Sequence, residues 1–215
     1  DKTFRSCEER IMRMKRSECQ GKSATEDGPD TMKQFSAFLP VRVYAGAGAV
    51  EQTGKLCARY GKKAMLVTMP WKGEQAVAFA RVKALLEAEG ITVVVYEGVT
   101  PNPTTVSINE ASVIARNEGV DMMIGMGGGS SIDAAKAIAV GATHPGVAWD
   151  YVYTSDKTAD PSITLPIIAI TTTSGTGSHV TKYAVFSNPD VKVKSTIVNA
   201  AVFPKTAIVD PTRGV

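Results

Sequence analysis

The stretch MMIGMGGGSSIDAAK, residues 122–136, places an apolar run, three consecutive glycines and a helix-forming run directly after one another. This order predicts a buried strand, a tight turn and a helix that begins at the turn. Glycines lack a Cβ and let a ligand approach the main chain, while the first N–H groups of the helix and its positive dipole end attract anions. We therefore expect this loop to hold a nucleotide or its pyrophosphate. The alternative is that the glycines only terminate the strand.

Short apolar runs and helical stretches alternate around this loop. Strands are predicted at residues 64–68, 91–96, 122–125 and 165–170, and helices at residues 50–60, 74–89 and 104–118. A glycine follows each helix, at Gly61, Gly90 and Gly119, as helix C-termini prefer. Strict alternation implies right-handed crossovers between parallel strands. The sequence therefore predicts an α/β fold, a doubly wound, mainly parallel sheet with helices on both faces, and ligands bind such sheets beyond the carboxyl ends of the strands.

Composition restricts the class of protein. The 215 residues are 44% hydrophobic and 21% charged, which is typical of a globular domain with a sizeable core. The 24 basic and 21 acidic residues are spread along the chain and no apolar run is long enough to span a membrane, so we expect neither nucleic acid nor membrane as a partner. The three cysteines, Cys7, Cys19 and Cys57, form no CxxC pair, which favours a reducing cytoplasm over a disulfide framework.

The first thirty residues differ from the rest. Charges dominate residues 1–22, and residues 21–30 have the composition of a linker. We predict that residues 1–31 are an extension or linker, that residues 32–215 form a nucleotide-binding α/β domain, and that Met32 is the natural start. The alternative for the extension is a short basic helix near residues 11–16 that binds a partner.

A second loop with ligand-binding character follows the strand predicted at residues 165–170. Its sequence, TTTSGTGS at residues 171–178, crowds hydroxyl groups and small residues at the end of a parallel strand. Hydroxyls in that place can bond phosphate oxygens or a carboxamide, and the alternative is that they satisfy the backbone of their own loop. The sequence GAGAVE at residues 46–51 lacks the third glycine of the dinucleotide fingerprint and is interpreted as a strand-to-helix turn.

Six short motifs follow one another along the chain in a specific order. They are FLP at 38–40, GAG at 46–48, TPNPT at 100–104, GGGSSIDAAKAIA at 127–139, TTSGTGS at 172–178 and AIVDP at 207–211. In order and spacing over residues 32–215, the chain resembles the iron-containing (group III) alcohol dehydrogenases, which have the dehydroquinate synthase-like fold. The resemblance covers the N-terminal, Rossmann-like nucleotide-binding domain of that family.

The resemblance implies an NAD(P)-dependent, metal-dependent oxidoreductase that interconverts alcohols and aldehydes or ketones by hydride transfer. It implies that the pyrophosphate is cradled by Gly128, Gly129 and Ser130, and that the remaining cofactor contacts come from Asn102, Asp133, Thr172, Thr173, Thr176 and Lys194. On the residues alone, two of these have alternatives. Asp133, expected in the first turn of a helix, could serve only to stabilise that helix through its dipole. Lys194 lies in the strand-like run 191–198, and its alternative is a solvated lysine.

The chain departs from the family's pattern at two positions. NAD-using members commonly carry an aspartate after the second strand, where this chain has Met69. Without that acid a 2′-phosphate is not repelled, so NAD and NADP both stay open, with Lys72 as the candidate phosphate partner. His179 stands where relatives commonly have glutamate, and we interpret it as a loop residue rather than a catalytic group or a metal ligand.

The resemblance places the metal ligands, one aspartate and three histidines, in a helical C-terminal domain that follows the segment matching residues 209–211. The chain ends at Val215, before that domain, and its two histidines, His144 and His179, do not make a site of three or four ligands. We therefore expect Fe²⁺ or another divalent ion only in the absent domain, no catalytic or metal-binding residue here, and no dehydrogenase activity from this chain alone.

Two alternatives to the alcohol dehydrogenase interpretation stay open. One is a glycerol or polyol dehydrogenase of the same fold, although the GTGS loop at residues 175–178 favours the alcohol dehydrogenases. The other is a stand-alone nucleotide-binding domain without catalysis. The partners implied by the resemblance are a nicotinamide dinucleotide, a small alcohol or aldehyde, and at least one further copy of the chain.

Overall fold

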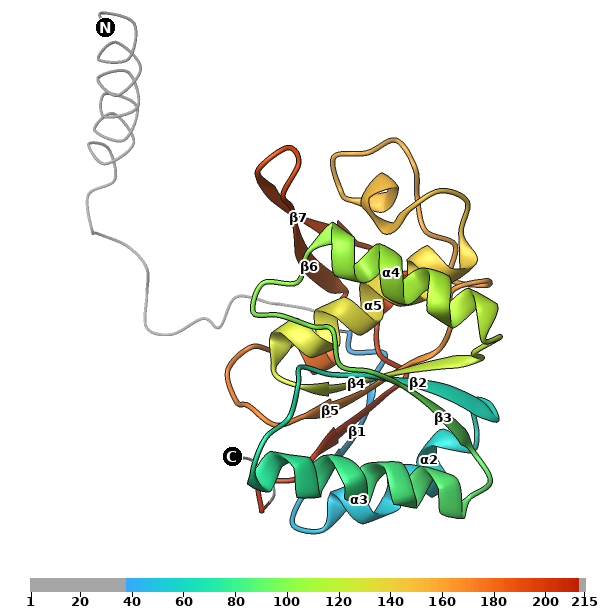
Figure 1. The fold of residues 1–215 in the computed structure, drawn as a ribbon, viewed down its shortest axis with the longest axis vertical. Coiled ribbons are helices and arrows are strands. Elements are labelled where there is room, and N and C mark those ends of the chain that lie inside the picture. Colours follow the sequence, from blue (N-terminus) through green and yellow to red (C-terminus); the bar gives the residue numbers. More distant parts are fainter. Residues whose placement is uncertain (1–37, 213–215) are drawn as a thin grey trace, which may run out of the picture. The chain divides into compact units, whose positions relative to one another are not determined.

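The computed structural model describes residues 38–212, which form an α/β domain (Figure 1). Six strands make one sheet in the order β1-β8-β5-β4-β2-β3, and every pair of neighbours is parallel. The strands are β1 Arg42–Ala45, β2 Lys63–Val67, β3 Thr92–Tyr96, β4 Met122–Gly127, β5 Ile167–Thr171 and β8 Thr206–Val209. The parallel sheet expected from the alternating pattern is confirmed. The extension predicted at residues 1–31 and its boundary with the domain lie outside the described residues and stay predictions.

Helices cover both faces of the sheet (Figure 1). The helices are α2 Thr53–Cys57, α3 Glu74–Ala88, α4 Thr105–Asn117 and α5 Gly129–Thr143. Successive residues of β2 point to opposite faces, so Met65 packs in the core cluster that contains α4 and α5, whereas Leu66 packs in the cluster that contains α2 and α3. Both side chains are fully buried, which explains why the central strands are continuous apolar runs rather than alternating ones.

The strand order changes direction between β2 and β4. The chain passes from β2 through α3 to β3 on one side, and it then returns to pair β4 with the other edge of β2 before continuing to β5. Such a switch point leaves a crevice at the carboxyl ends of the two strands, which is where doubly wound sheets bind ligands. The loops that follow β2 and β4 meet there, because a Cβ on Gly127 would lie 3.8 Å from Cζ2 of Trp71.

Two of the three predicted glycine stops are confirmed and one is wrong. Gly90 and Gly119 follow α3 and α4 in the left-handed region, with φ of 72° and 61°, which costs glycine little. Gly61 does not end a helix, since α2 already ends at Cys57 with Ala58 as its C-cap. The helix predicted over residues 50–60 is instead a 3₁₀ turn, Ala49–Gln52, followed by the short α2.

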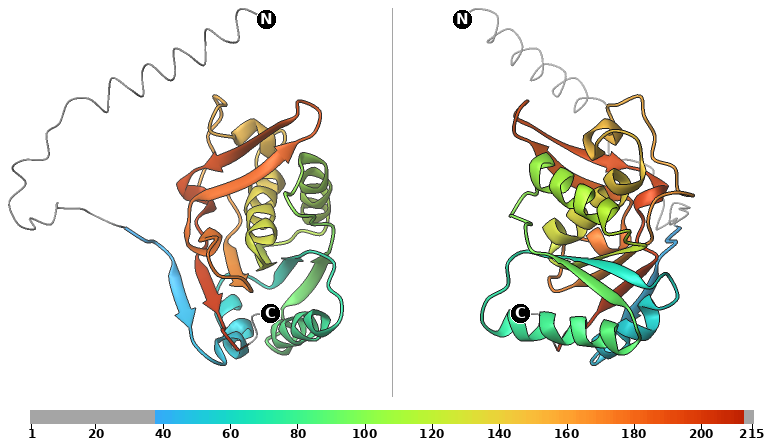
Figure 2. Two further views of the ribbon diagram at one scale, coloured as in Figure 1. Left: turned by 90° about the vertical axis from the view of Figure 1, so that its left-hand side faces the viewer. Right: turned by 45° about the vertical axis from the view of Figure 1, so that its right-hand side comes forward.

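An antiparallel pair of strands, β6 Tyr183–Asn188 and β7 Val193–Val198, lies outside the main sheet. The strand-like character of residues 191–198 predicted one member of this pair, and the pairing itself was not predicted. Figure 2 shows the ribbon lying against α5, where Ala184 and Phe186 of β6 and Ile197 of β7 are fully buried. The ribbon therefore adds a wall beside the N-terminal half of α5. None of the helices within residues 38–212 is long and apolar enough to cross a membrane.

Candidate functional site

The glycine loop connects β4 to α5 as expected. Gly127 ends the strand with φ of 137°, a backbone conformation that side chains rarely allow, and Gly128 is the N-cap of α5 in an extended conformation. The helix begins at Gly129, so its first N–H groups have no partner within the helix and face the end of the sheet. This arrangement provides an anion site at the N-terminus of a helix of 15 residues.

The hydroxyl-rich loop after β5 packs directly against the glycine loop. The backbone N–H of Thr172 donates to the carbonyl of Gly127 at 3.0 Å. A Cβ on Gly128 would lie 3.3 Å from Oγ1 of Thr173, and a Cβ on Gly129 would lie 3.2 Å from Oγ of Ser178. The two loops therefore lie side by side, and a Cβ at the second or third glycine would require the neighbouring side chains to shift by a few tenths of an ångström.

Some hydroxyls of this loop also serve their own backbone, as the alternative interpretation held. The Thr171 hydroxyl donates to the carbonyl of Thr173 at 2.9 Å, and Oγ1 of Thr176 accepts from the N–H of Ser178 at 3.3 Å. Both hydroxyls fix the shape of the loop, and neither bond excludes a ligand contact, since a hydroxyl can donate and accept at once.

Six of the nine residues predicted to bind the cofactor line one pocket of about 470 Å³, which we call the helix-side pocket. They are Asn102, Gly129, Ser130, Asp133, Thr176 and Lys194. At its rim, Nζ of Lys194 donates to Oδ1 of Asn102 at 2.7 Å. Lys194 is exposed but paired, and Asn102 holds a left-handed conformation with φ of 57° that presents its amide to the lysine. The sequence analysis did not anticipate that these two residues contact each other.

Two further predicted residues, Thr172 and Thr173, line a different pocket of about 670 Å³, the strand-side pocket, together with His179 and Asp210. Asp210 is buried there, and its carboxylate accepts from the N–H groups of Val50 and Thr212, at 3.2 and 3.1 Å. The ninth predicted residue, Gly128, faces Thr173. Eight of the nine predicted residues are thus divided between two pockets, and Gly128 lines neither.

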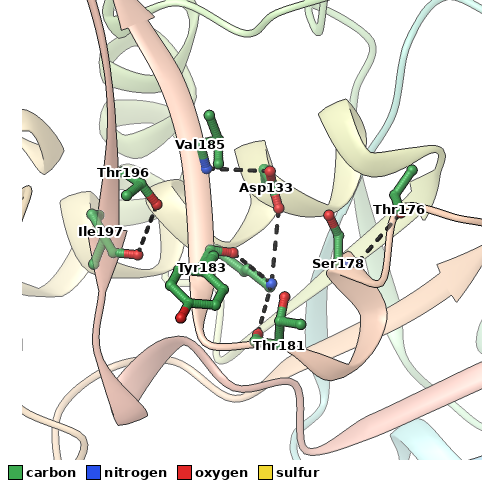
Figure 3. A network of polar contacts seen from close by, with 9 residues as sticks. Asp133, Thr176, Ser178, Thr181, Tyr183, Val185, Thr196 and Ile197 are labelled. Carbon is green, nitrogen blue, oxygen red and sulfur yellow. Dashed lines mark hydrogen bonds and ion pairs between the residues drawn. The ribbon is translucent and has the colours of Figure 1, made fainter. Parts of the chain in front are cut away.

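The alternative interpretation of Asp133, that it serves only to stabilise the helix from its first turn, is wrong. Asp133 is the fifth residue of α5, and no acidic residue lies in the first turn. Its Oδ2 accepts from the N–H of Val185 on β6 at 3.2 Å (Figure 3). Its Oδ1 is buried, has no hydrogen-bond partner among the described residues, and lies 3.8 Å from Nζ of Lys136. Burial raises the pKa of Asp133, and the charge of Lys136 is the largest influence against that rise.

Lys136 is the polar residue of the site that the sequence analysis missed. Its side chain is fully buried, and its Nζ donates to the carbonyls of Thr181 at 2.9 Å and Tyr183 at 2.7 Å. Burial lowers the pKa of Lys136 to about 8. A signal for it was present: Lys136 lies three residues after Asp133, and the residues between and beside them are small or apolar, so the two charges share one face of a buried helix.

The two histidines differ in their surroundings. His144 was expected in a loop and is the buried C-cap of α5, where Nε2 accepts from the N–H of Asp160 at 2.8 Å. His179 lies in the 3₁₀ turn Ser178–Val180, and burial lowers its pKa, with the charge of Lys136 adding to the effect. Within residues 38–212 no group of three or more His, Cys, Asp or Glu side chains is placed to hold a metal ion.

Comparison with known proteins adds to this geometry. The family model described as "Iron-containing alcohol dehydrogenase" matches residues 40–211. A choline dehydrogenase of Bacillus subtilis is 37% identical over 184 residues, which are 85% of this chain and 46% of the relative. The chain therefore spans about half the length of such curated relatives.

Solved structures agree in fold. The archaeal halo-thermophilic alcohol dehydrogenase ADH/D1 from a Red Sea brine pool, bound to NZQ, matches with a TM-score of 0.77 and 39% identity, over 84% of this chain and 47% of that protein. An NADH-dependent butanol dehydrogenase A of Thermotoga maritima matches with a TM-score of 0.78 and 30% identity, over 85% of this chain and 46% of that protein.

Proposed function

Because the chain belongs to the iron-containing alcohol dehydrogenase family, we propose that it is the cofactor-binding half of an NAD(P)-dependent, metal-dependent alcohol dehydrogenase. The resemblance carried by its motifs is confirmed by that membership. The observation that carries the proposal is the contact between the glycine loop and the hydroxyl-rich loop at the N-terminus of α5. A generic strand stop would need neither the close approach of the two loops nor a buried carboxylate beside them.

The residues present fit a dinucleotide. A Cβ at Gly128 or Gly129 would make a tight contact with the neighbouring loop, and without one the main chain is open to an approaching phosphate. Oδ1 of Asp133 is a buried acceptor without a hydrogen-bond partner among residues 38–212. Such an atom costs free energy unless a donor reaches it, and ribose hydroxyls and carboxamides are donors.

Roles for the nine residues follow from their positions. Gly128, Gly129 and Ser130 bind the pyrophosphate through backbone N–H groups at the start of α5. The remaining contacts are assigned to the helix-side pocket, with Asn102, Asp133, Thr176 and Lys194, and to the strand-side pocket, with Thr172 and Thr173. When bound, the dinucleotide supplies hydride transfer and the metal supplies Lewis-acid polarisation of the substrate oxygen. The metal ligands are assigned to a segment outside residues 38–212.

Nucleotide titration tests the proposal. We expect the purified protein to bind NAD⁺ or NADP⁺ in isothermal titration calorimetry with one site per chain. No heat of binding with either dinucleotide at millimolar concentration would refute it. A gene product that continues past residue 215 with one aspartate and three histidines on helical spacing supports the enzyme over a stand-alone nucleotide-binding domain. Turnover of a panel of simple alcohols and polyols by that longer protein separates the alcohol dehydrogenase from the polyol dehydrogenase.

The choice between NAD and NADP depends on the loop after β2. Met69 and the exposed Lys72 lie in this loop, at the carboxyl end of the strand beside β4. We expect Met69→Asp to weaken NADP⁺ binding by about tenfold or more, since a carboxylate beside a phosphate costs roughly 1.4 kcal/mol or more, and to leave NAD⁺ binding unchanged or stronger. Calorimetry with both dinucleotides measures the difference.

The matched control places an acid on α3, the helix that follows the loop. Val77→Asp, at an exposed position of α3, is expected to affect neither dinucleotide. Equal weakening of NAD⁺ and NADP⁺ by Met69→Asp would show that position 69 does not face the 2′ position of the ribose.

We also propose the substrate, the location and the assembly of the protein. A small alcohol or aldehyde follows from the family, and the cytoplasmic location from the cysteine pattern. A homodimer or larger assembly is consistent with β1, a strand at the edge of the sheet whose Val43 is exposed.

A further inference from the structure

We infer that Lys136 is a positioning residue of the dinucleotide site: its buried ammonium group ties the start of β6 to α5 and holds the Asp133 carboxylate at the helix-side pocket. The inference rests on the proposed function, because the pocket that Lys136 shapes is the one assigned to the dinucleotide. Lys136 itself is fully buried and is therefore not a ligand contact.

Hydrogen bonds from Lys136 join the two halves of the pocket. Thr181 and Tyr183, whose carbonyls accept from Nζ, both line the helix-side pocket, and so does Asp133 on the same helix as Lys136. Figure 3 shows Asp133 between Val185 of β6 and the segment at Thr181. Residues 178–183 continue the hydroxyl-rich loop into β6. The ammonium group of Lys136 thus fixes the position of the chain between the end of the hydroxyl-rich loop and the start of β6.

Folding stability alone does not account for a charged group at this position. In the unfolded chain the lysine keeps its proton to about pH 10.5, whereas in the folded protein it loses the proton at about pH 8. Between these values the unfolded state binds more protons, so stability rises with pH, and the protonated form is the one that costs the fold free energy. Burial of the charged lysine therefore carries a desolvation cost, and Asp133, the other member of the pair, lines the pocket.

The ammonium charge also balances Asp133 near the phosphate-binding loop. Asp133 lies four residues after Gly129, about 6 Å along the helix axis. The charged or titratable groups around the pair are His179 from the 3₁₀ turn, whose pKa burial lowers, and Lys194 from β7. When Lys136 loses its proton, the negative charge of Asp133 is less compensated and repels phosphate. Dinucleotide affinity should therefore fall as pH rises through about 8.

The test is the pH dependence of NAD⁺ or NADP⁺ affinity, whichever the wild-type protein binds better, between pH 6.5 and 9.5. In the wild type we expect the affinity to fall by about tenfold across pH 8. In Lys136→Met we expect affinity about tenfold weaker at pH 7 and no fall across pH 8. Lys136→Gln keeps amide donors for the carbonyls of Thr181 and Tyr183 without the charge, so it is the second variant if the methionine variant does not fold. We expect it to show the same flat pH profile.

Lys83→Met is the matched control, because Lys83 forms an exposed ion pair with Glu87 on α3, on the other face of the sheet. It should keep the wild-type affinity and pH profile. Wild-type affinity and the wild-type pH profile in a folded Lys136→Gln protein would overturn the inference while leaving the proposed function intact. Absence of dinucleotide binding by the wild type at every pH would instead overturn the proposed function.

Discussion

Gly129→Val is expected to lower the affinity for NAD⁺ or NADP⁺ by about 100-fold or more. A Cβ at this position would lie 3.2 Å from Oγ of Ser178 and 3.3 Å from Cβ of Thr176, and valine adds two methyl groups beyond it. Either the two loops separate or the methyl groups occupy the place of the phosphate. Losing two hydrogen bonds to a charged phosphate, at roughly 1.5–3 kcal/mol each, gives that loss of affinity. Calorimetric titration of the purified variant measures it.

A smaller substitution at the same position and a matched substitution on α3 test whether the loss of affinity is specific to the start of α5. Gly129→Ala should weaken binding less than valine, because only the Cβ contacts must be relieved. Ala80→Val adds the same methyl groups at an exposed position of α3 and should bind as the wild type does. Thermal unfolding in the absence of nucleotide checks that each variant is folded. A folded Gly129→Val protein with wild-type affinity would mean that the dinucleotide does not approach the start of α5.

Strands β2, β3, β4 and β5 were predictable because each carries its own signal in the sequence, whereas β1 and β8 were not among the predicted strands. β2, β4 and β5 are buried on both faces, so they are continuous apolar runs, and the left-handed glycines after α3 and α4 mark where those helices end. The segment at residues 49–57 was less predictable. Its apolar positions fit a helix, yet the chain there makes a 3₁₀ turn and a five-residue helix. The N–H of Val50 in this turn donates to the carboxylate of Asp210, 160 residues later, which is a contact that local sequence does not reveal.

The site was predictable as far as it is made of local sequence motifs. The two loops follow adjacent parallel strands, so their contact follows from the topology. The pairing of Lys194 with Asn102 and the burial of Lys136 depend instead on β6 and β7, an antiparallel ribbon whose position is set by packing on α5. From sequence alone, a charged residue in a helix is expected to be exposed to solvent, and only the element that covers Lys136 shows that it is buried.

Gly125→Ala is expected to destabilise the domain by about 1–3 kcal/mol and to weaken dinucleotide binding as well. Gly125 lies in the middle of β4, and a Cβ there would lie 2.9 Å from Cα of Ile132 and 3.0 Å from Cβ of Ala135. The first of these contacts is to the backbone of α5, so the helix itself must move away from the sheet. Its N-terminal N–H groups move with it. Urea unfolding measures the stability, and nucleotide titration of the same sample measures the affinity.

We attribute the expected destabilisation to packing against α5 and not to backbone strain. The φ of Gly125 is not in the left-handed region, so alanine can adopt the backbone conformation. Gly125→Val should therefore be worse than alanine in both measurements. Val77→Ala, at a position 68% exposed on α3, should change stability by no more than about 0.5 kcal/mol and leave binding unchanged. If Gly125→Ala loses stability and keeps full affinity, the position of the N-terminus of α5 is fixed by the loops around it and not by the packing of α5 against β4. If stability and affinity are lost together, the packing of α5 against β4 positions the phosphate-binding N–H groups.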